Sequence, residues 1–318
     1  MTRLAVIGAS QIAEEHIRAA ASAGFEITGI AASPHSINAK NLAAKFNTTF
    51  FTDYQELLFS AKHHDALLIS TKPAITTKIL SELQDFNQPI LCEKPVSLNL
   101  KSLKAVELKS AQLYVAYNRR FYPDVNFLKS EIDLSFGSAT FRIYEPRVDK
   151  WENDDSNNPI INNSVHVLDL VGLLAGTHIM ADSWVDSSHT VGRFIYENSV
   201  GVQISIEVFL GYPGNTSVEI YSGDRIFQLK PLEKLTIFDA LRVELDELGR
   251  RTYLPEISPR EVMNFEENQN LKPGFEGMWK EFHAVVKNGE SPSNLATLRD
   301  SVNALTKAIQ ISDKFKNA

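Results

Sequence analysis

Short apolar runs alternate with helical patterns over about the first 120 residues of the chain. Between the first two runs, apolar residues recur at helical spacing from Ile12 to Ala23, and Gly24 follows as a helix terminator. Buried strands that alternate with helices are typical of a parallel sheet covered on both faces. The runs that predict such strands are Leu4–Ile7, Ile27–Ala31, Ala66–Ser70 and Pro89–Cys92.

A different pattern occupies the middle of the chain. Apolar and polar side chains alternate from Gly201 to Phe209, which is typical of a strand with one covered face and one polar face. Gly192–Tyr196 precedes this strand, and Glu197-Asn198 suits a hairpin turn between the two. Turn signals recur further on, so we expect a mainly antiparallel sheet from about Gly137 to Leu254.

Composition narrows the class of protein. Of 318 residues, 43% are hydrophobic and 22% are charged, which fits a globular chain of about two domains. The net charge of −7, without a basic block, argues against nucleic acid or an anionic membrane as partner. Cys92 is the only cysteine, so an internal disulfide is impossible. No apolar run approaches the ~18 residues of a membrane span. Leu4-Ala5-Val6-Ile7 is too short for the apolar region of a signal peptide, so we expect none. We therefore expect a cytoplasmic protein.

A candidate phosphate-binding turn follows the first predicted strand. Gly8-Ala9-Ser10-Gln11-Ile12-Ala13 occupies the place of a G-x-G-x-x-G/A fingerprint, with Ser10 in place of the middle glycine. Such a strand-to-helix turn points backbone N–H groups and the positive end of a helix dipole at a pyrophosphate. We predict cofactor contacts for Gly8, Ser10, Gln11 and Ile12. A small-residue turn in another α/β fold is the alternative.

The end of the second predicted strand bears on cofactor choice. An acidic residue at this point would hold the adenosine ribose of NAD and repel the 2′-phosphate of NADP. The chain has Ile30-Ala31-Ala32-Ser33-Pro34-His35 here, without an acid. We favour NADP slightly over NAD, with Ser33, His35 or Lys40 as contacts of the phosphate. Alternatively, Ser33 only caps the next helix.

A lysine stands directly after the fourth predicted strand, in Cys92-Glu93-Lys94-Pro95. This position lies at the carboxyl edge of the sheet, where α/β proteins bind ligands. Pro95 biases Lys94 towards an extended backbone. A surface salt bridge of Glu93 is the simpler explanation of the same residues.

Several motifs together resemble the Gfo/Idh/MocA oxidoreductases, the relatives of glucose–fructose oxidoreductase and inositol dehydrogenase. The resemblance implies a Rossmann domain, residues 1–118, followed by an α+β domain with an open, mainly antiparallel sheet, residues 119–318. It also implies a nicotinamide cofactor and a sugar or cyclitol substrate. The motifs are Gly8-x-Ser10-x-Ile12-Ala13-x-x-His16, Thr71-Lys72-Pro73, Cys92-Glu93-Lys94-Pro95, Tyr117-Asn118-Arg119-Arg120-Phe121-x-Pro123 and Phe275-x-x-Met278-Trp279-x-x-Phe282.

The resemblance assigns roles to individual residues. Lys94 matches the catalytic lysine of the family, and Glu93 matches a residue that shapes the turn beside the nicotinamide ribose. Asn118 matches a position near the nicotinamide, and Thr71 and Pro73 belong to a motif on the cofactor side. No metal site is predicted.

An apolar segment further along the chain carries three polar residues. Asn162, His166 and Asp169 are spaced i, i+4, i+7, so they share one face if the segment is helical. The alternative is a helix start capped by Asn163 or Ser164, with His166 a satisfied core histidine. By resemblance, His166 matches the catalytic histidine and Asp169 a following aspartate.

Asn162 stands where the family has an aspartate. An amide can orient an imidazole but cannot stabilise its charged form, so a simple polyol dehydrogenase is in doubt. The asparagine is similar to the pattern of sugar-nucleotide members, and it would suit a hydrogen bond to a substrate hydroxyl.

Arg147 and Trp151 precede this segment. They could bind an anionic or ring-shaped part of the substrate. An exposed arginine beside a packing tryptophan is the alternative. Arg119 and Arg120 are further candidates, of which at least one makes only structural salt bridges. Together with Asp169, we take Arg119, Arg147 and Trp151 as the substrate-binding set.

The sequence therefore predicts an NAD(P)-dependent oxidoreductase acting on a secondary alcohol or ketone of a sugar or sugar derivative, nucleotide-linked sugars included. In the oxidation direction His166 would take the hydroxyl proton, Lys94 would hydrogen-bond the same oxygen, and Asn162 would fix the histidine or the substrate. The alternative is a non-catalytic dinucleotide-binding sensor of the same fold. A third possibility is hydrolysis or elimination with a recycled cofactor. The resemblance also implies a homodimer or homotetramer built through the C-terminal sheet.

Overall fold

The structure, a computed structural model, describes residues 1–60, 63–106, 112–133, 137–148, 155–176, 178–198, 201–258 and 270–317. The chain divides into two compact units. Unit 1 comprises Met1–Phe121 and Glu266–Thr306, and unit 2 comprises Tyr122–Phe265 and Lys307–Ala318. The sequence analysis placed 266–306 in the second domain. In the structure this segment belongs to unit 1, because helix α8 (Phe275–Asn288) packs against helix α1 (Ala13–Ser22) of that unit.

Unit 1 is built on a seven-stranded sheet in the order β15-β6-β5-β4-β1-β2-β3. Six of the strands are parallel, and β15 runs antiparallel to β6. The order of the six parallel strands is that of a doubly wound dinucleotide-binding fold. The four buried strands predicted from the sequence correspond to β1, β2, β4 and β5. The strands are β1 (Thr2–Ile7), β2 (Phe25–Ala31), β3 (Thr49–Phe51), β4 (Ala66–Ile69), β5 (Ile90–Cys92), β6 (Leu113–Val115) and β15 (Ala296–Thr297).

Helices cover the sheet of unit 1. Three of them begin at a capping side chain, because Ser36, Asp53 and Asn99 each accept a hydrogen bond from a backbone N–H of the first turn. The remaining helices of this unit are α2 (Ile37–Lys45), α3 (Tyr54–Leu58), α4 (Pro73–Glu82), α5 (Leu100–Lys104), a 3₁₀ helix (Asn118–Phe121) and residues 298–306 of α9 (Leu298–Asn317).

Aromatic side chains form the core between β2, α1 and α8. Trp279 and Phe282 of α8 are fully buried and meet Phe25 of β2, with ring centroids 5.5 and 5.9 Å away. Aromatic pairs in these geometries add to the stability that their burial already provides. This contact explains why a segment near the end of the chain completes the N-terminal fold.

Unit 2 contains an eight-stranded sheet in the order β14-β13-β12-β11-β7-β10-β9-β8. All neighbours are antiparallel except β7 and β10, so the sheet is mainly antiparallel as the sequence predicts. The predicted hairpin is β9 and β10. Glu197 is the last residue of β9 and pairs with Gln203, and the Asn198 N–H after it donates to the Val202 carbonyl at 3.1 Å. The strands are β7 (Ser138–Glu145), β8 (Ile179–Val185), β9 (Val191–Glu197), β10 (Gln203–Leu210), β11 (Ser217–Ser222), β12 (Arg225–Leu229), β13 (Leu235–Leu245) and β14 (Arg251–Ile257).

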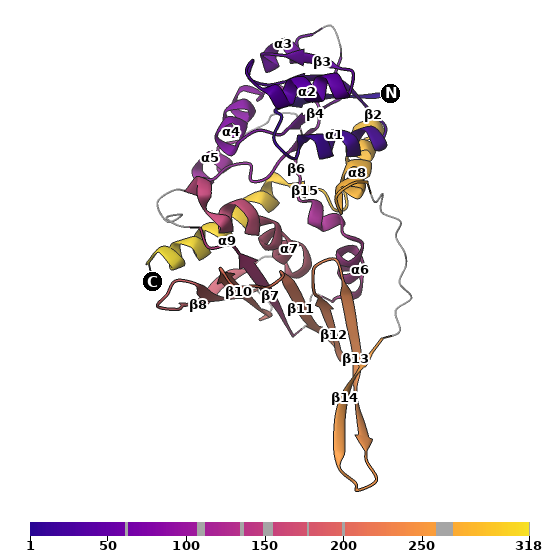
Figure 1. Ribbon diagram of the computed structural model, residues 1–318, viewed down its shortest axis with the longest axis vertical. Helices are drawn as coiled ribbons and strands as arrows, with labels where there is room; N and C mark the ends of the chain where they lie inside the picture. Colours follow the sequence, from indigo (N-terminus) through magenta and orange to yellow (C-terminus); the bar gives the residue numbers. More distant parts are fainter. Residues whose placement is uncertain are drawn as a thin grey trace. The chain divides into compact units, whose positions relative to one another are not determined.

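Helices lie on one side of this sheet (Figure 1). Along β7 and β10 every second side chain is buried, and the alternate ones are partly exposed. The other face of the sheet is therefore uncovered in this chain over the described residues. The helical elements of unit 2 are α6 (Pro123–Glu131), a 3₁₀ turn (Asp155–Asn157), a π-helical turn (Ile160–Ser164), α7 (Val165–Ala175) and residues 307–317 of α9.

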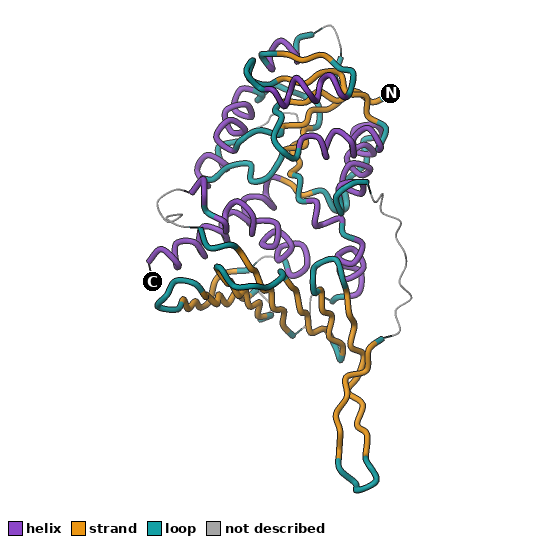
Figure 2. The backbone as a smooth tube through the Cα atoms, in the orientation of Figure 1, coloured by secondary structure: helices purple, strands orange, loops and turns teal. Residues whose placement is uncertain are grey.

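The hairpin of β13 and β14 extends past the other strands of its sheet (Figure 2). Within the described part of the chain, β13 pairs only with β14 from Ala240 onward, and both faces of this two-stranded ribbon are exposed. The exposed apolar side chains on the hairpin include Leu241, Val243, Leu245, Tyr253 and Ile257. Among the described residues, no helix is both long and apolar enough to cross a membrane.

Candidate active site

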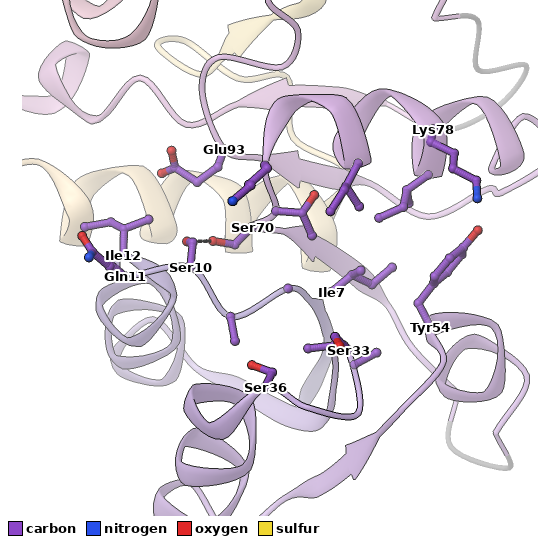
Figure 3. Close-up of a pocket in the computed structure, with 18 of the residues that line it drawn as sticks. Ile7, Ser10, Gln11, Ile12, Ser33, Ser36, Tyr54, Ser70, Lys78 and Glu93 are labelled. Atoms are coloured by element: carbon purple, nitrogen blue, oxygen red, sulfur yellow. Dashed lines mark hydrogen bonds between the residues drawn. The ribbon is translucent and has the colours of Figure 1, made fainter. Parts of the chain in front are cut away.

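A cavity of about 950 Å³ opens at the carboxyl ends of the parallel strands in unit 1 (Figure 3). In Figure 3, Ser33 and Ser36 lie on one side of Ser10, and Glu93 lies on the other. Eight of the residues predicted to bind the cofactor or to act in catalysis line this cavity. They are Gly8, Ser10, Gln11, Ile12, Ser33, Thr71, Glu93 and Lys94.

The turn after β1 is closed by hydrogen bonds to the neighbouring strands. The Gly8 N–H donates to the Ala31 carbonyl at 2.8 Å, and the Ser10 and Ser70 hydroxyls lie 2.6 Å apart. Gly8 has a φ of +99°, and a Cβ on it would lie 2.2 Å from the Ser70 carbonyl oxygen. Only glycine fits there, whereas Ser10 takes the place of the second glycine by bonding to Ser70.

The start of α1 suits the pyrophosphate of a dinucleotide. Within the described residues no side chain caps this helix, so its first backbone N–H groups face the end of the turn without a side-chain acceptor. The helix dipole adds positive potential at the same point. The cavity, the close approach at Gly8 and the uncapped helix start together fit a bound dinucleotide.

The cavity side near β2 carries hydroxyls. Ser36 is the cap of α2, accepting from the Ala39 N–H at 3.2 Å, so the alternative role for Ser33 as the helix cap is wrong. Ser33 instead accepts a 3.4 Å hydrogen bond from the His35 N–H and lines the cavity. Lys40, a predicted phosphate contact, is not among the lining residues and lies over the Phe50 ring.

Sequence reasoning missed the wall formed by α3 and α4. Tyr54 and Lys78 line the cavity, and both contact Glu82, through the Tyr54 hydroxyl and through an ion pair of 3.9 Å. Lys72 lines it as well, and its place in Thr71-Lys72-Pro73 was a usable signal. Tyr54 and Lys78 left no such signal, because they reach the cavity only through the packing of two helices.

Glu93 and Lys94 follow β5 directly. The Glu93 N–H donates to the Ile69 carbonyl at 2.8 Å, which holds the turn against β4. One carboxylate oxygen of Glu93 lies 2.6 Å from Nε2 of His16, and the other accepts from the Lys94 N–H at 2.9 Å. The surface salt bridge considered for Glu93 is therefore wrong, because its partner His16 is fully buried.

Other predicted cofactor residues have structural partners. Asn118 donates to the Pro273 carbonyl at 2.9 Å, and Pro73 is the first residue of α4. Neither is among the residues that line the cavity.

Arg120 is buried, 3.3 Å from the Asn294 carbonyl and 3.5 Å from Asp300, so it is the structural member of the arginine pair. Arg119 is partly exposed.

The predicted histidine helix is α7, preceded by a π-helical turn. His166 and Asp169 lie three residues apart on α7 and are 8% and 2% exposed. Asn162 lies in the π-helical turn, whose wider spacing breaks the i, i+4, i+7 alignment expected on a regular α-helix. Its side-chain amide donates to the carbonyls of Ser156 and Asn158, both at 2.9 Å.

The capping alternative for this helix is wrong. Asn163 and Ser164 both donate to the buried carboxylate of Glu145 on β7, at 2.9 and 2.7 Å. Among the described residues, no side chain caps the start of α7. These bonds tie the π-helical turn to the sheet instead.

The residues that were predicted to bind the substrate lie in different environments. Burial lowers the pKa of Lys307 on α9, and the nearby charge of Asp169 opposes that shift. Asp169 thus faces a buried cation of its own unit. Arg147 is exposed and lies next to Gly211, and Trp151 lies outside the described residues.

Burial also raises the pKa of Cys92, so this thiol is not a nucleophile at neutral pH.

Comparison with known proteins agrees with this geometry. Residues 2–117 match a family model described as an oxidoreductase family with an NAD-binding Rossmann fold. The rhizopine catabolism protein MocA of Rhizobium meliloti is 28% identical over 134 residues, covering 41% of this chain and 42% of MocA. Inositol 2-dehydrogenase 2 of Paenarthrobacter aurescens is 24% identical over 205 residues, covering 59% and 60%. The chain spans about half the length of these curated relatives.

Solved structures share the whole fold. A levoglucosan dehydrogenase in complex with NADH and L-sorbose superimposes with a TM-score of 0.76 at 15% identity, covering 99% of this chain and 97% of that one. At this identity the likeness concerns the fold of both units. Residues 2–117 therefore match the Gfo/Idh/MocA oxidoreductase family over its NAD-binding Rossmann fold.

Proposed function

We propose that the chain is an NAD(P)-dependent oxidoreductase that acts on a secondary alcohol or ketone of a sugar, a cyclitol or a nucleotide-linked sugar. One observation carries the proposal: a single cavity joins the phosphate-binding turn at Gly8 to the turn that carries Lys94. Relatives named inositol 2-dehydrogenase and a structural neighbour holding NADH and L-sorbose support the substrate class. The buried Cys92, the only cysteine, is compatible with the reducing cytoplasm.

The residues have distinct tasks in this proposal. A bound nicotinamide would supply the hydride chemistry. Lys94 donates a hydrogen bond to the reacting oxygen and stabilises the negative charge that develops on it. His166 accepts the proton of that hydroxyl as hydride leaves the same carbon, so the alcohol becomes a ketone. Lys94 is in unit 1 and His166 in unit 2, so their convergence is part of the proposal.

Replacement of Lys94 tests the activity. We expect Lys94→Ala to lower kcat by about 100-fold or more with the best substrate, because a preorganised donor to a developing oxyanion is worth about this much. Cofactor affinity, measured by the fluorescence of the reduced nicotinamide, should stay within about threefold. Lys101→Ala, on the exposed surface of α5, is the matched control and should behave as wild type.

Two outcomes would contradict this reading. Wild-type turnover in Lys94→Ala would remove Lys94 from the mechanism. Tight binding of cofactor without turnover of any sugar, cyclitol or nucleotide sugar would instead favour the non-catalytic sensor.

We also propose a preference for NADP. Hydroxyls of Ser33 and Ser36 line the cavity beside the end of β2, and the first carboxylate on this side, Asp53, is bound to the Gln55 N–H at the start of α3. A 2′-phosphate would meet hydroxyl donors rather than an acid at the end of β2. Titration should give a lower Kd for NADPH than for NADH, and Ser33→Asp should reverse the order by about tenfold or more through charge repulsion. Equal affinities in the wild type would contradict the preference.

The partner proposed for this chain is a second copy of itself. Support comes from the uncovered face of the eight-stranded sheet, which continues onto the exposed ribbon of β13 and β14. No nucleic-acid or membrane partner is proposed.

A further inference from the structure

A row of hydrogen bonds runs from α8 through α1 to the backbone of Lys94. The indole Nε1 of Trp279 lies 3.1 Å from Nδ1 of His16, and Nε2 of His16 lies 2.6 Å from a carboxylate oxygen of Glu93. The second oxygen of Glu93 accepts from the Lys94 N–H at 2.9 Å. Four residues from three distant parts of the sequence thus form one connected set inside unit 1.

The direction of every bond in this row is fixed by chemistry. An indole N–H can only donate, so Nδ1 of His16 must be the acceptor. A neutral imidazole then carries its proton on Nε2 and donates it to Glu93. The Glu93 carboxylate accepts from both sides, which suits its ionised form.

The imidazole has little room to leave this arrangement. His16 and Trp279 are both fully buried, and the Glu93 side chain is 12% exposed. The His16 ring lies 4.9 Å from the Phe275 ring and 5.8 Å from the Trp279 ring. A flip of the imidazole would put Cδ2–H opposite the indole N–H and Cε1–H opposite the Glu93 carboxylate, so both hydrogen bonds would be lost. Packing and hydrogen bonding therefore hold the same orientation.

We infer that His16 and Trp279 are positioning residues for the proposed reaction. They hold the carboxylate of Glu93, which in turn holds the backbone of Lys94 at the cavity. Neither His16 nor Trp279 is among the residues that line the cavity, so they act only through Glu93. The effect on turnover rests on the proposed function, whereas the hydrogen-bond polarity does not.

A pair of variants separates hydrogen-bond polarity from simple packing. In Glu93→Gln the NH₂ group of the amide must face either the His16 Nε2–H or the Lys94 N–H. In either case two hydrogen-bond donors face each other and one bond is lost. In Trp279→Phe the indole donor is gone, so His16 can carry its proton on Nδ1 and accept from the glutamine amide through Nε2. The Trp279→Phe change therefore relieves the conflict created by Glu93→Gln.

The expected result is a non-additive cycle. Each single variant should lower kcat. Relative to wild type, the kcat of the double variant should be at least about fivefold higher than the product of the relative kcat values of the two single variants. Phe282→Leu, in the same buried aromatic core but outside the row, is the control and should combine with Glu93→Gln additively. Additive losses in the Glu93→Gln and Trp279→Phe pair would overturn the inference.

A second readout does not depend on turnover. Nitrogen-15 NMR of the histidine rings should show His16 as the Nε2–H tautomer in the wild type and as the Nδ1–H tautomer in the double variant, with the signal assigned through His16→Gln. If no substrate is ever turned over, the NMR result still tests the row, and the proposed function fails alone. An Nδ1–H tautomer in the wild type would refute the polarity of the row even if the enzyme were active.

Discussion

At the scale of single residues, the cavity depends on two turns, the one at Gly8 after β1 and the one at Lys94 after β5. Gly8 and Lys94 each follow a buried strand, so their place at the carboxyl edge of the sheet could be predicted without a structure. Tyr54 and Lys78 reach the same cavity through helix packing, which no local pattern encodes. Asn162 was predicted on the wrong periodicity, because a π-helical turn cannot be recognised from apolar spacing alone.

The phosphate-binding turn depends on the absence of one atom. Gly8→Ala would place a methyl group 2.2 Å from the Ser70 carbonyl oxygen at a φ of +99°, so β1 and β4 would have to separate. We expect this variant to lower the affinity for reduced nicotinamide cofactor by about tenfold or more and to lower Tm.

Gly24→Ala is the matched control, since Gly24 has a similar φ of +103° but its added Cβ would first meet His283 at 3.4 Å, an ordinary contact. It carries the same backbone strain without the clash, and it lies outside the cavity lining. Equal effects of the two variants on Tm and on cofactor affinity would show that strain alone, and not the close approach to Ser70, matters at Gly8.

At the scale of elements, periodicity predicted the strands better than the connections. Continuous apolar runs gave β1, β2, β4 and β5, and strict alternation gave the β9–β10 hairpin, because burial on two faces or one leaves these patterns. The assignment of α8 to the second domain was wrong. Its apolar stripe shows that the helix is covered but cannot show by which sheet, since any apolar face would satisfy it.

The turn between β8 and β9 should give the fold an acid-sensitive element. Burial raises the pKa of Asp186, but hydrogen bonds from Ser188, Val191 and Thr190 outweigh it and hold the pKa below its ordinary value. The Thr190 and Val191 N–H groups both donate to this carboxylate at 2.7 Å. Because the folded pKa is lowered, the stabilisation is present above the unfolded pKa of about 3.9 and is lost as pH falls below it.

Asp186→Asn mimics the protonated side chain. We expect it to reduce the free energy of unfolding by about 1 kcal/mol at pH 7, since the charge-assisted bonds become neutral ones. The difference from wild type in urea denaturation should be constant above about pH 5 and should shrink progressively as pH falls through the unfolded pKa of about 3.9 and below it. Asp182→Asn, an exposed aspartate on β8, is the control. A difference that stays constant with pH would exclude the charge of Asp186 as the cause.

At the scale of the whole molecule, the two kinds of sheet were predictable from the sequence, and the extended hairpin was not. Both a covered and an uncovered two-stranded ribbon show alternating side chains, so β13 and β14 look like ordinary strands of the sheet in the sequence. In the structure the ribbon is amphipathic. Leu241, Val243 and Leu245 share one face, and the opposite face carries an ion pair between Arg242 and Glu244.

The apolar face of the ribbon supports the proposed self-association. Leu241, Val243, Leu245 and Tyr253 are 48–66% exposed, and exposed apolar patches of this kind mark contact surfaces. One face of the ribbon has an area of only roughly 200 Å², because it is about six residues long at about 3.4 Å per residue and two strands wide at about 4.8 Å per strand. A stable interface buries about 800 Å² per partner, so the ribbon must extend a larger contact. The uncovered face of the same sheet adjoins it and carries charges that are already paired, as Arg142 and Arg193 are with Glu207.

Variants on the two faces of the ribbon test this contact. Val243→Glu should weaken the dimer by about tenfold or more in analytical ultracentrifugation, because a charge would be buried in an apolar interface. Thr252→Glu introduces the same charge on the opposite face, opposite Glu244, and should leave the association constant unchanged. A wild-type chain that stays monomeric at micromolar concentration, or equal weakening by both variants, would mean that the apolar face does not contact a second copy. Loss of the dimer in Val243→Glu alone would place the contact on the face that carries Leu241 and Tyr253, since cross-strand neighbours share one side of a two-stranded ribbon.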